Sequence, residues 1–167
     1  MAAGKPGGAW RALAERAVEE FRAALGEDLL AVAWFGSSAR GEATPGSDLD
    51  LYVVARGQGL SAFERCAATL DALDASVEYR ALTGGGYRPD PMPIFQTPEK
   101  LATHPWILLD IADHGEVLYD PSGLLTRELD AIRARLRQLG SKRIQQPDGT
   151  WYWDLKPDWR PGEIFSL

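Results

Sequence analysis

Two short apolar segments, close together in the sequence, most constrain what this chain can fold into. The first, LLAVAWF at residues 29–35, has no polar break, which is typical of a strand buried on both faces. The second, LDLYVVA at residues 49–55, alternates and also predicts a strand. The stretch between them is rich in turn residues, and Gly41 with Pro45-Gly46 lets the chain reverse. We therefore expect the second strand to lie beside the first.

Helical patterns surround these strands, so the chain is predicted to be an α/β protein with helices packed on a small mixed sheet. Apolar spacings of three and four residues predict helices from Trp10 to Leu25, from about Leu60 through Val77 to the glycines at 84–86, across WILLDIAD at 106–113 and from Leu125 to Leu139. Short strands are expected at PDPMPIFQT (89–97), where the prolines favour a sheet edge, and at EVLY (116–119). We expect one domain over residues 9–140. Residues 141–167 form a tryptophan-rich tail that packs on the domain or on a partner.

Composition excludes several classes of function. The net charge of −6 argues against an overall nucleic-acid surface. The single cysteine, Cys66, excludes a disulfide within the chain, and with two histidines it argues against a zinc site of thiolates and imidazoles. No apolar run approaches the length of a membrane span, and the first ten residues lack the apolar core of a signal peptide. A cytoplasmic location is expected.

Two carboxylates, Asp48 and Asp50, flank one leucine where the second strand begins. Because side chains alternate along a strand, both carboxylates should point to the same face. Carboxylates so close resist ionising together unless a cation lies between them. Mg²⁺ suits the pair because it uses one or two carboxylates and takes other oxygens from phosphate and water. Two such ions, roughly 3.5–4 Å apart, would serve in-line phosphoryl transfer.

The Gly36-Ser37 pair follows the first strand and supplies the second half of the pattern. Gly36 lets the backbone approach a ligand closely. If a short helix begins here, its free N–H groups and the Ser37 hydroxyl could bind a phosphate next to the two aspartates. A D-x-D pair alone is most often a solvated strand end. The combination with the glycine-serine turn and two apolar strands is much more specific.

Gly36-Ser37, Arg40-Gly41, Gly46-Ser47-Asp48 and Asp50-Leu51 together resemble the signature of the DNA polymerase beta-type nucleotidyltransferase superfamily. More narrowly, they resemble the minimal nucleotidyltransferases of bacteria and archaea. The resemblance implies a nucleotidyltransferase fold that moves a nucleoside monophosphate, here AMP from ATP, to an acceptor hydroxyl with two Mg²⁺ ions. It implies that Gly36, Ser37, Arg40 and Ser47 bind the nucleotide, and that Asp48 and Asp50 hold the metals. The chain contains no Walker-type phosphate loop.

The resemblance also implies a third carboxylate from a later strand, which completes a metal site and takes the proton of the acceptor. Asp90 is the only acid in RPDPMPIFQT (88–97), and we assign it this role. The competing interpretation is that Asp90 only begins a turn, since Asp-Pro pairs favour turns. Glu78 is the rival acid, but it falls within a helical pattern.

The acceptor follows only from the resemblance, because minimal nucleotidyltransferases often act as antitoxins paired with a small helical HEPN toxin. A tyrosine hydroxyl of such a partner is the first expectation. A small-molecule acceptor such as an aminoglycoside is the alternative enzyme, although those enzymes usually carry a larger second domain. A catalytically silent module that binds nucleotide or a partner is the alternative from another class.

Overall fold

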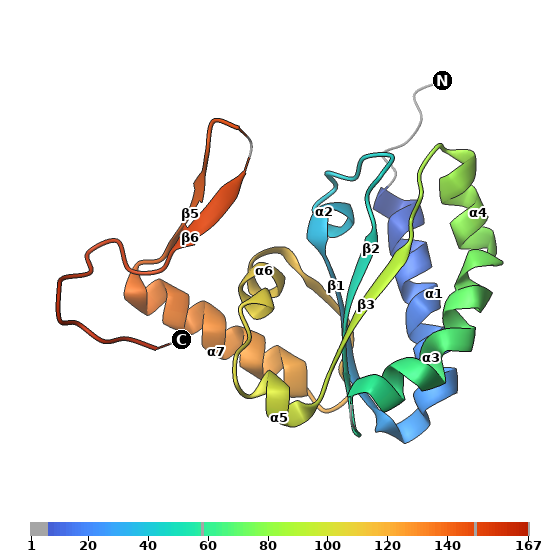
Figure 1. The fold of residues 1–167 in the computed structure, drawn as a ribbon, viewed down its shortest axis with the longest axis horizontal. Helices are drawn as coiled ribbons and strands as arrows, with labels where there is room; N and C mark the ends of the chain where they lie inside the picture. Colours follow the sequence, from blue (N-terminus) through green and yellow to red (C-terminus); the bar gives the residue numbers. More distant parts are fainter. Residues whose placement is uncertain (1–6, 58, 149, 167) are drawn as a thin grey trace.

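A four-stranded mixed sheet lies between two layers of helices in the computed structural model, which describes residues 7–57, 59–148 and 150–166 (Figure 1). The strand order is β3-β2-β1-β4, with β1 antiparallel to β2 and β4 and β2 parallel to β3. The strands of the sheet are β1 (Leu29–Phe35), β2 (Leu49–Ala55), β3 (Pro91–Gln96) and β4 (Glu116–Tyr119). The predicted α/β fold with a mixed sheet is confirmed, and the two apolar segments form its centre.

The helices divide between the two faces of this sheet (Figure 1). One face is covered by α1 (Gly7–Leu25), α3 (Gly59–Asp74) and α4 (Val77–Gly84), and the other by α5 (Pro98–Leu101), α6 (Ile107–His114) and α7 (Leu124–Leu139). A 3₁₀ turn (Gly26–Asp28) connects α1 to β1. Strand β2 shows the consequence of this layering, because Leu51 and Val53 pack on the first side and Tyr52 and Val54 on the second. Both faces of β1 are therefore buried, as its unbroken apolar run predicted. Strand β2, which was predicted from its alternation, is also buried on both faces from Leu51 to Ala55.

The helix predicted to run from about Leu60 through Val77 to the glycines at 84–86 is in fact two helices, so that prediction is wrong. Helix α3 ends at Asp74, and the Ser76 hydroxyl caps α4 by accepting a hydrogen bond of 3.1 Å from the Tyr79 backbone N–H. A serine favours a helix start because its side chain satisfies a backbone donor that the first turn leaves free. Val77 fits the apolar spacing but does not pack in the core, since its side chain is 65% exposed.

Strand β3 lies at an outer edge of the sheet, as its prolines predicted. It runs parallel to β2, and the backbone N–H of Leu49 donates to the carbonyl of Asp90 over 2.9 Å just before the strand begins. Thr97 then caps α5 by accepting from the Lys100 backbone N–H, with Pro98 at the first helical position. This strand brings the segment around Asp90 alongside the start of β2.

After α7 the chain forms a two-stranded hairpin, β5 (Lys142–Gln145) and β6 (Trp151–Asp154), that projects from the body (Figure 1). The last residues return to α7, where the Arg135 side chain donates to the carbonyl of Ser166 over 2.8 Å. Trp153 and Leu155 pack against the apolar cluster beneath α6 and α7. An aromatic tail was predicted here from the sequence, but this hairpin was not.

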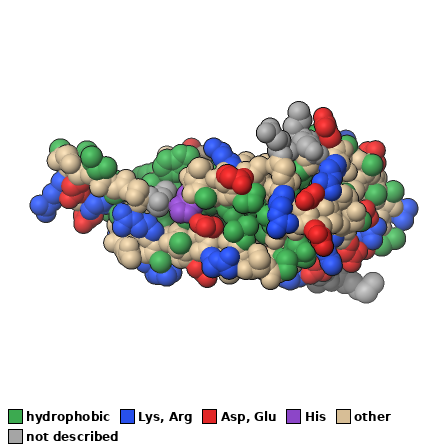
Figure 2. All heavy atoms as spheres, turned by 90° about the horizontal axis from the view of Figure 1, so that it is seen from below, with side chains coloured by type: hydrophobic (Ala, Val, Ile, Leu, Met, Phe, Trp, Pro, Cys, Tyr) green, Lys and Arg blue, Asp and Glu red, His purple; other side chains and the backbone are tan. Residues whose placement is uncertain are grey.

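The surface charges and the helix lengths can be compared with two expectations from composition, namely no overall nucleic-acid surface and no membrane span. On the face seen in Figure 2, Lys and Arg side chains are interspersed with Asp and Glu and form no continuous basic surface. None of the helices in the described part of the chain has the length and apolar character needed to cross a bilayer.

Candidate active site

Gly36 lies in a tight turn, and the Asp50 carboxylate packs against this turn. It begins the four-residue helix α2 (Gly36–Ala39) directly after β1, with a φ of +77° that side-chain-bearing residues rarely adopt. A Cβ atom placed there would lie 2.0 Å from Oδ2 of Asp50. Glycine is therefore needed because the Asp50 carboxylate rests against the turn. From the sequence, this space was predicted to admit a phosphate; in the structure the Asp50 carboxylate occupies the Cβ position itself.

The loop between β1 and β2 is held in shape by its own polar groups. The Ser37 hydroxyl donates to the Ser47 hydroxyl over 3.0 Å, and the Thr44 backbone N–H donates to the same Ser47 oxygen over 2.8 Å. The Glu42 backbone N–H donates to the carbonyl of Ser37 over 2.9 Å. The two serines predicted to bind nucleotide thus lie together, at the mouth of the β1–β2 hairpin.

Asp50 is the carboxylate most affected by its surroundings. It pairs with Phe35 across the first two strands, so it stands directly beside the turn at Gly36. Burial raises the pKa of Asp50, the charges of Asp48 and Asp110 raise it further, and Arg40 opposes them. The predicted mutual repulsion of Asp48 and Asp50 is therefore present. A bound cation would relieve it.

Arg40 and Asp110 form the inner wall of the site. The Arg40 guanidinium contacts Glu42 through Nε at 2.8 Å and Asp110 through Nη1 at 3.5 Å. The Asp110 oxygen that faces Arg40 is buried and has no hydrogen-bond partner among the described residues, since 3.5 Å is long for such a bond. Asp110 was not among the site residues predicted from the sequence. The available signal was an acid placed between Leu109 and Ile111, which are both buried on α6.

Asp90 lies at the start of β3 and is exposed. Its backbone N–H donates to the carbonyl of Arg88 in a tight turn, and its carboxylate raises the pKa of Tyr79 and of Asp74 on the α3–α4 side, secondarily to their burial. Asp90 has no comparable influence on Asp50, whereas Asp110 does. Asp90 therefore immediately precedes the first pair of β2 and β3, Leu49 with Pro91, and its charge acts on Asp74 of α3 and Tyr79 of α4.

The donor set fits Mg²⁺ better than a softer metal, because only carboxylate and hydroxyl oxygens converge here. Asp48, Asp50, Asp110 and Glu42 place four carboxylates near the guanidinium of Arg40, and Arg143 adds a second positive charge beside Glu42. An anionic triphosphate would be repelled by this excess unless a cation accompanied it. Within the described residues no three His, Cys, Asp or Glu side chains are already grouped closely enough to hold a metal. Two carboxylates completed by phosphate and water remain a suitable arrangement for Mg²⁺.

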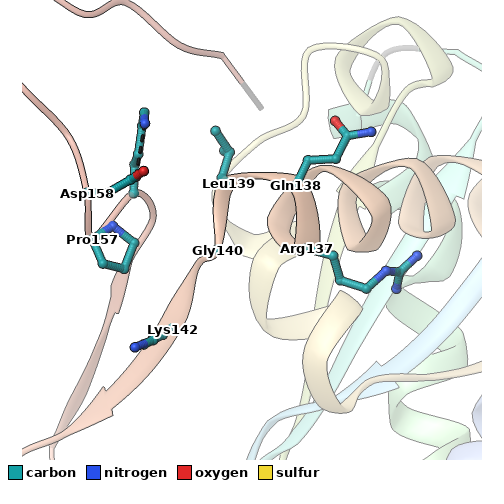
Figure 3. A pocket seen from close by; sticks show the side chains of 8 residues that line it. Arg137, Gln138, Leu139, Gly140, Lys142, Pro157 and Asp158 are labelled. Atoms are coloured by element: carbon teal, nitrogen blue, oxygen red, sulfur yellow. Dashed lines mark hydrogen bonds and ion pairs between the residues drawn. The ribbon is translucent and has the colours of Figure 1, made fainter.

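A cavity of about 340 Å³ at the C-terminal end of α7 contains none of these residues. Arg137, Lys142 and Pro157 line it, and Figure 3 shows that the Arg137 side chain points away from Lys142. The third cation of the lining, Lys156, is paired with Asp158 at 2.9 Å, so this cavity does not gather free cations around a phosphate. The candidate active site is the mouth of the β1–β2 hairpin.

A central antiparallel strand pair is joined by a Gly-Ser turn and carries Asp48 and Asp50 around the start of its second strand. Such carboxylates suit a divalent cation that takes its other oxygens from phosphate and water. Residues 15–90 match the family model of the nucleotidyltransferase domain, and this part of the chain is such a domain. The predicted resemblance to nucleotidyltransferases is confirmed for residues 15–90, and the enzyme class is that of this domain. No curated protein sequence matches the chain.

Several solved structures also match, all at low identity. One is a toxin–antitoxin complex with AMP-PNP, at 14% identity and a TM-score of 0.47, covering 75% of this chain and 92% of that one. Another is the tri-AMPylated Shewanella oneidensis HEPN toxin in complex with an MNT antitoxin, at 11% identity and a TM-score of 0.42, covering 78% and 92%. A third is an MntA–HepT toxin–antitoxin pair, at 13% identity and a TM-score of 0.41, covering 77% and 92%.

Proposed function

We propose that this protein transfers AMP from ATP to an acceptor hydroxyl with the help of Mg²⁺. The observation that carries the proposal is the seating of Asp50 against the Gly36 turn, with Asp48 beside it. This arrangement places two carboxylates at the point where the chain offers the Ser37 and Ser47 hydroxyls. Bound Mg²⁺ would neutralise the triphosphate and polarise its phosphorus–oxygen bonds.

The chain's own residues take the following roles in this proposal. Asp48 and Asp50 hold the metal ions, with two ions as the expected number. The backbone at Gly36 and the hydroxyls of Ser37 and Ser47 position the phosphates, and Arg40 supplies the cation. In the reaction a bond forms between the acceptor oxygen and the α-phosphorus, the bond from that phosphorus to the bridging oxygen breaks, and pyrophosphate leaves with its electrons.

The acceptor proton needs a base, and two carboxylates are available for this role. Asp90 is the residue expected from its position in the chain. Asp110 is the rival that the geometry supports, because it faces Arg40 and acts on Asp50. A carboxylate within reach of the acceptor hydroxyl would accept its proton as the new bond forms.

For the acceptor, we propose a tyrosine hydroxyl of a small helical HEPN-type toxin, which would make this protein an antitoxin. The proposal rests on the resemblance of the motif to minimal nucleotidyltransferases. The solved complexes show toxin, AMP-PNP and AMPylation for those proteins, not for this one. A small hydroxylated molecule is the alternative acceptor, and nucleotide binding without transfer is the alternative activity.

The proposal is tested by incubating the purified protein with Mg²⁺, each α-labelled nucleoside triphosphate and the product of the adjacent gene. We expect label from ATP to appear on a tyrosine of that product, and the label to disappear with Asp48→Asn. Transfer that persists in Asp48→Asn would overturn the metal assignment. ATP binding with no transfer to any acceptor would leave the silent module as the function.

A further inference from the structure

A small cavity separates the active-site loop from the C-terminal hairpin. It measures about 180 Å³ and is lined by Glu42 of the loop and by Arg143, Gln145 and Trp151 of β5 and β6. This volume lies below the range of about 300–1,000 Å³ that encloses a whole drug-sized ligand, so it suits a single ring system. The lining residues come from segments about one hundred positions apart in sequence, and only the fold brings them together.

The cavity adjoins the proposed phosphate site. The Glu42 backbone N–H donates to the carbonyl of Ser37 over 2.9 Å, and the Glu42 carboxylate contacts Arg40 at 2.8 Å. The hairpin is tied to the same region, because Arg143 lies 2.6 Å from the His114 ring nitrogen and 3.5 Å from the Asp113 carboxylate at the end of α6. Arg40 lowers the pKa of Glu42, and Arg143 and His114 add to the effect. The charges of Glu42 in the loop and Arg143 in the hairpin are therefore close enough to interact.

Once the charge pairs of this cavity are set aside, the groups that remain are of the kind that recognises a flat, uncharged ring. Glu42 and Arg143 already have partners of opposite charge. The Arg143 guanidinium lies over the Trp151 indole at 4.1 Å from its centroid, and both kinds of plane stack on nucleobases. The Gln145 side chain is exposed and makes no hydrogen bond within the described part of the chain. Its amide can donate and accept at the same time.

We propose that this cavity is the nucleobase subsite and that it selects adenine, with Trp151 as the stacking surface and Gln145 as the reader. A glutamine amide accepts from the N6 amino group of adenine and donates to N7, a pairing that guanine cannot offer because it has oxygen at position 6. Glu42, between the phosphate turn and the cavity, is placed to accept a hydrogen bond from a ribose hydroxyl. The inference rests on the proposed function, since it supplies the base end of the same nucleotide.

Calorimetry on the full chain with Mg²⁺ tests the subsite without any turnover. The probes are non-hydrolysable analogues of ATP and GTP, and tripolyphosphate, which has no base. Trp151→Ala should weaken binding of the ATP analogue about tenfold, while tripolyphosphate binds as before. Trp151→Phe should restore most of the loss. Tyr152→Ala, on the same strand and with its side chain on the opposite face, is the matched control and should change neither affinity.

Gln145→Arg provides a second test that does not depend on removing an aromatic ring. Arginine pairs with O6 and N7 of guanine, so this variant should shift the ratio of affinities toward the GTP analogue by about tenfold. An ATP-analogue affinity unchanged in Trp151→Ala would overturn the subsite, as would a loss shared equally with tripolyphosphate. Failure of the wild-type chain to bind any of the three probes would overturn the proposed function together with the subsite.

Discussion

Gly36 and Asp50 depend on each other at the scale of single residues. The carboxylate can stand beside the turn only because residue 36 has no side chain, and the positive φ at that position also favours glycine. Gly41 offers a natural comparison, since its φ of +73° is similar but no described atom lies within 4 Å of its Cβ position. Comparing the same substitution at the two glycines therefore separates the cost of backbone strain from the cost of a collision with Asp50.

Gly41→Ala should lower the free energy of unfolding by about 1 kcal/mol, through the left-handed backbone alone. Gly36→Ala should cost a further 1–3 kcal/mol, about the cost of overpacking, because the new methyl group displaces the Asp50 carboxylate. It should also abolish nucleotide binding. Urea unfolding and calorimetry on both variants check this. Equal losses of stability in the two variants would show that the contact with Asp50 is unimportant.

The charge on Asp50 should destabilise the metal-free fold. Its pKa is raised in the folded protein, so the cost is fully present at a pH above the folded value and vanishes below the ordinary pKa of 3.8. Asp50→Asn should therefore raise the free energy of unfolding at pH 7 in EDTA and lose this advantage as the pH falls through the acid range. Mg²⁺ should stabilise the wild-type protein and not the variant. A variant less stable than wild type at pH 7 would contradict this.

Asp90 and Asp110 can be separated as candidates for the base. Substitution of the carboxylate that acts as the base by Asn should leave ATP affinity within a few-fold. It should slow single-turnover transfer by about a hundredfold or more. Asn at the other position should leave the rate near that of wild type. The paired measurement uses the same preparation for affinity and rate. Equal behaviour of both variants and the parent would show that neither carboxylate takes the acceptor proton.

The predicted site residues that the structure brings together are those whose contacts are local. Gly36, Ser37, Asp48 and Asp50 all lie within a single strand–turn–strand unit, where spacing determines which side chains meet. Asp110 could not be found this way, because its place beside Arg40 depends on how α6 packs across the sheet. Asp90 was placed on the correct strand end, yet the direction of its carboxylate depends on a turn at Arg88 that periodicity does not describe.

At the scale of elements, caps rather than apolar periodicity decide where helices begin and end. The break between α3 and α4 was not predicted because Val77 fits the apolar spacing of one continuous helix. The residue that indicates the break is Ser76, the N-cap of α4. The hairpin of β5 and β6 was missed because each strand has only four residues, too few for alternation to stand out. Long patterns such as those of α1 and α7 were predicted within one to three residues.

Ser76→Ala should lower the free energy of unfolding by about 1 kcal/mol, the usual cost of losing an N-cap. The lost interaction is the hydrogen bond from the Tyr79 backbone N–H to the Ser76 hydroxyl. Ser76→Asp keeps an acceptor at the same place and should retain most of the stability. Thermal unfolding of the three proteins checks this. A neutral Ser76→Ala would show that α3 and α4 are joined by packing alone.

At the scale of the whole molecule, the chain consists of a layered body and an appended tail. Trp153 and Leu155 anchor the tail on the cluster beneath α6 and α7, while Gln145 and Trp151, the last pair before the turn of the hairpin, line a cavity with Glu42. A chain ended after Gly140 should still unfold cooperatively, with a free energy of unfolding lower by roughly 2 kcal/mol for the apolar contacts removed. Circular dichroism during urea unfolding checks this. Loss of the cooperative transition would make the tail part of the core domain.

The prolines of β3 have a consequence for how copies of the molecule behave together. Asp90 directs its carbonyl toward β2, so Pro91 and Pro93, at the alternate positions, direct their backbone outward. Neither proline has an N–H, so the β3 edge lacks two of the backbone donors that a strand from another molecule would need for pairing. The prolines that confine β3 to the border of the sheet therefore also make this edge a poor template for strand pairing between copies of the molecule.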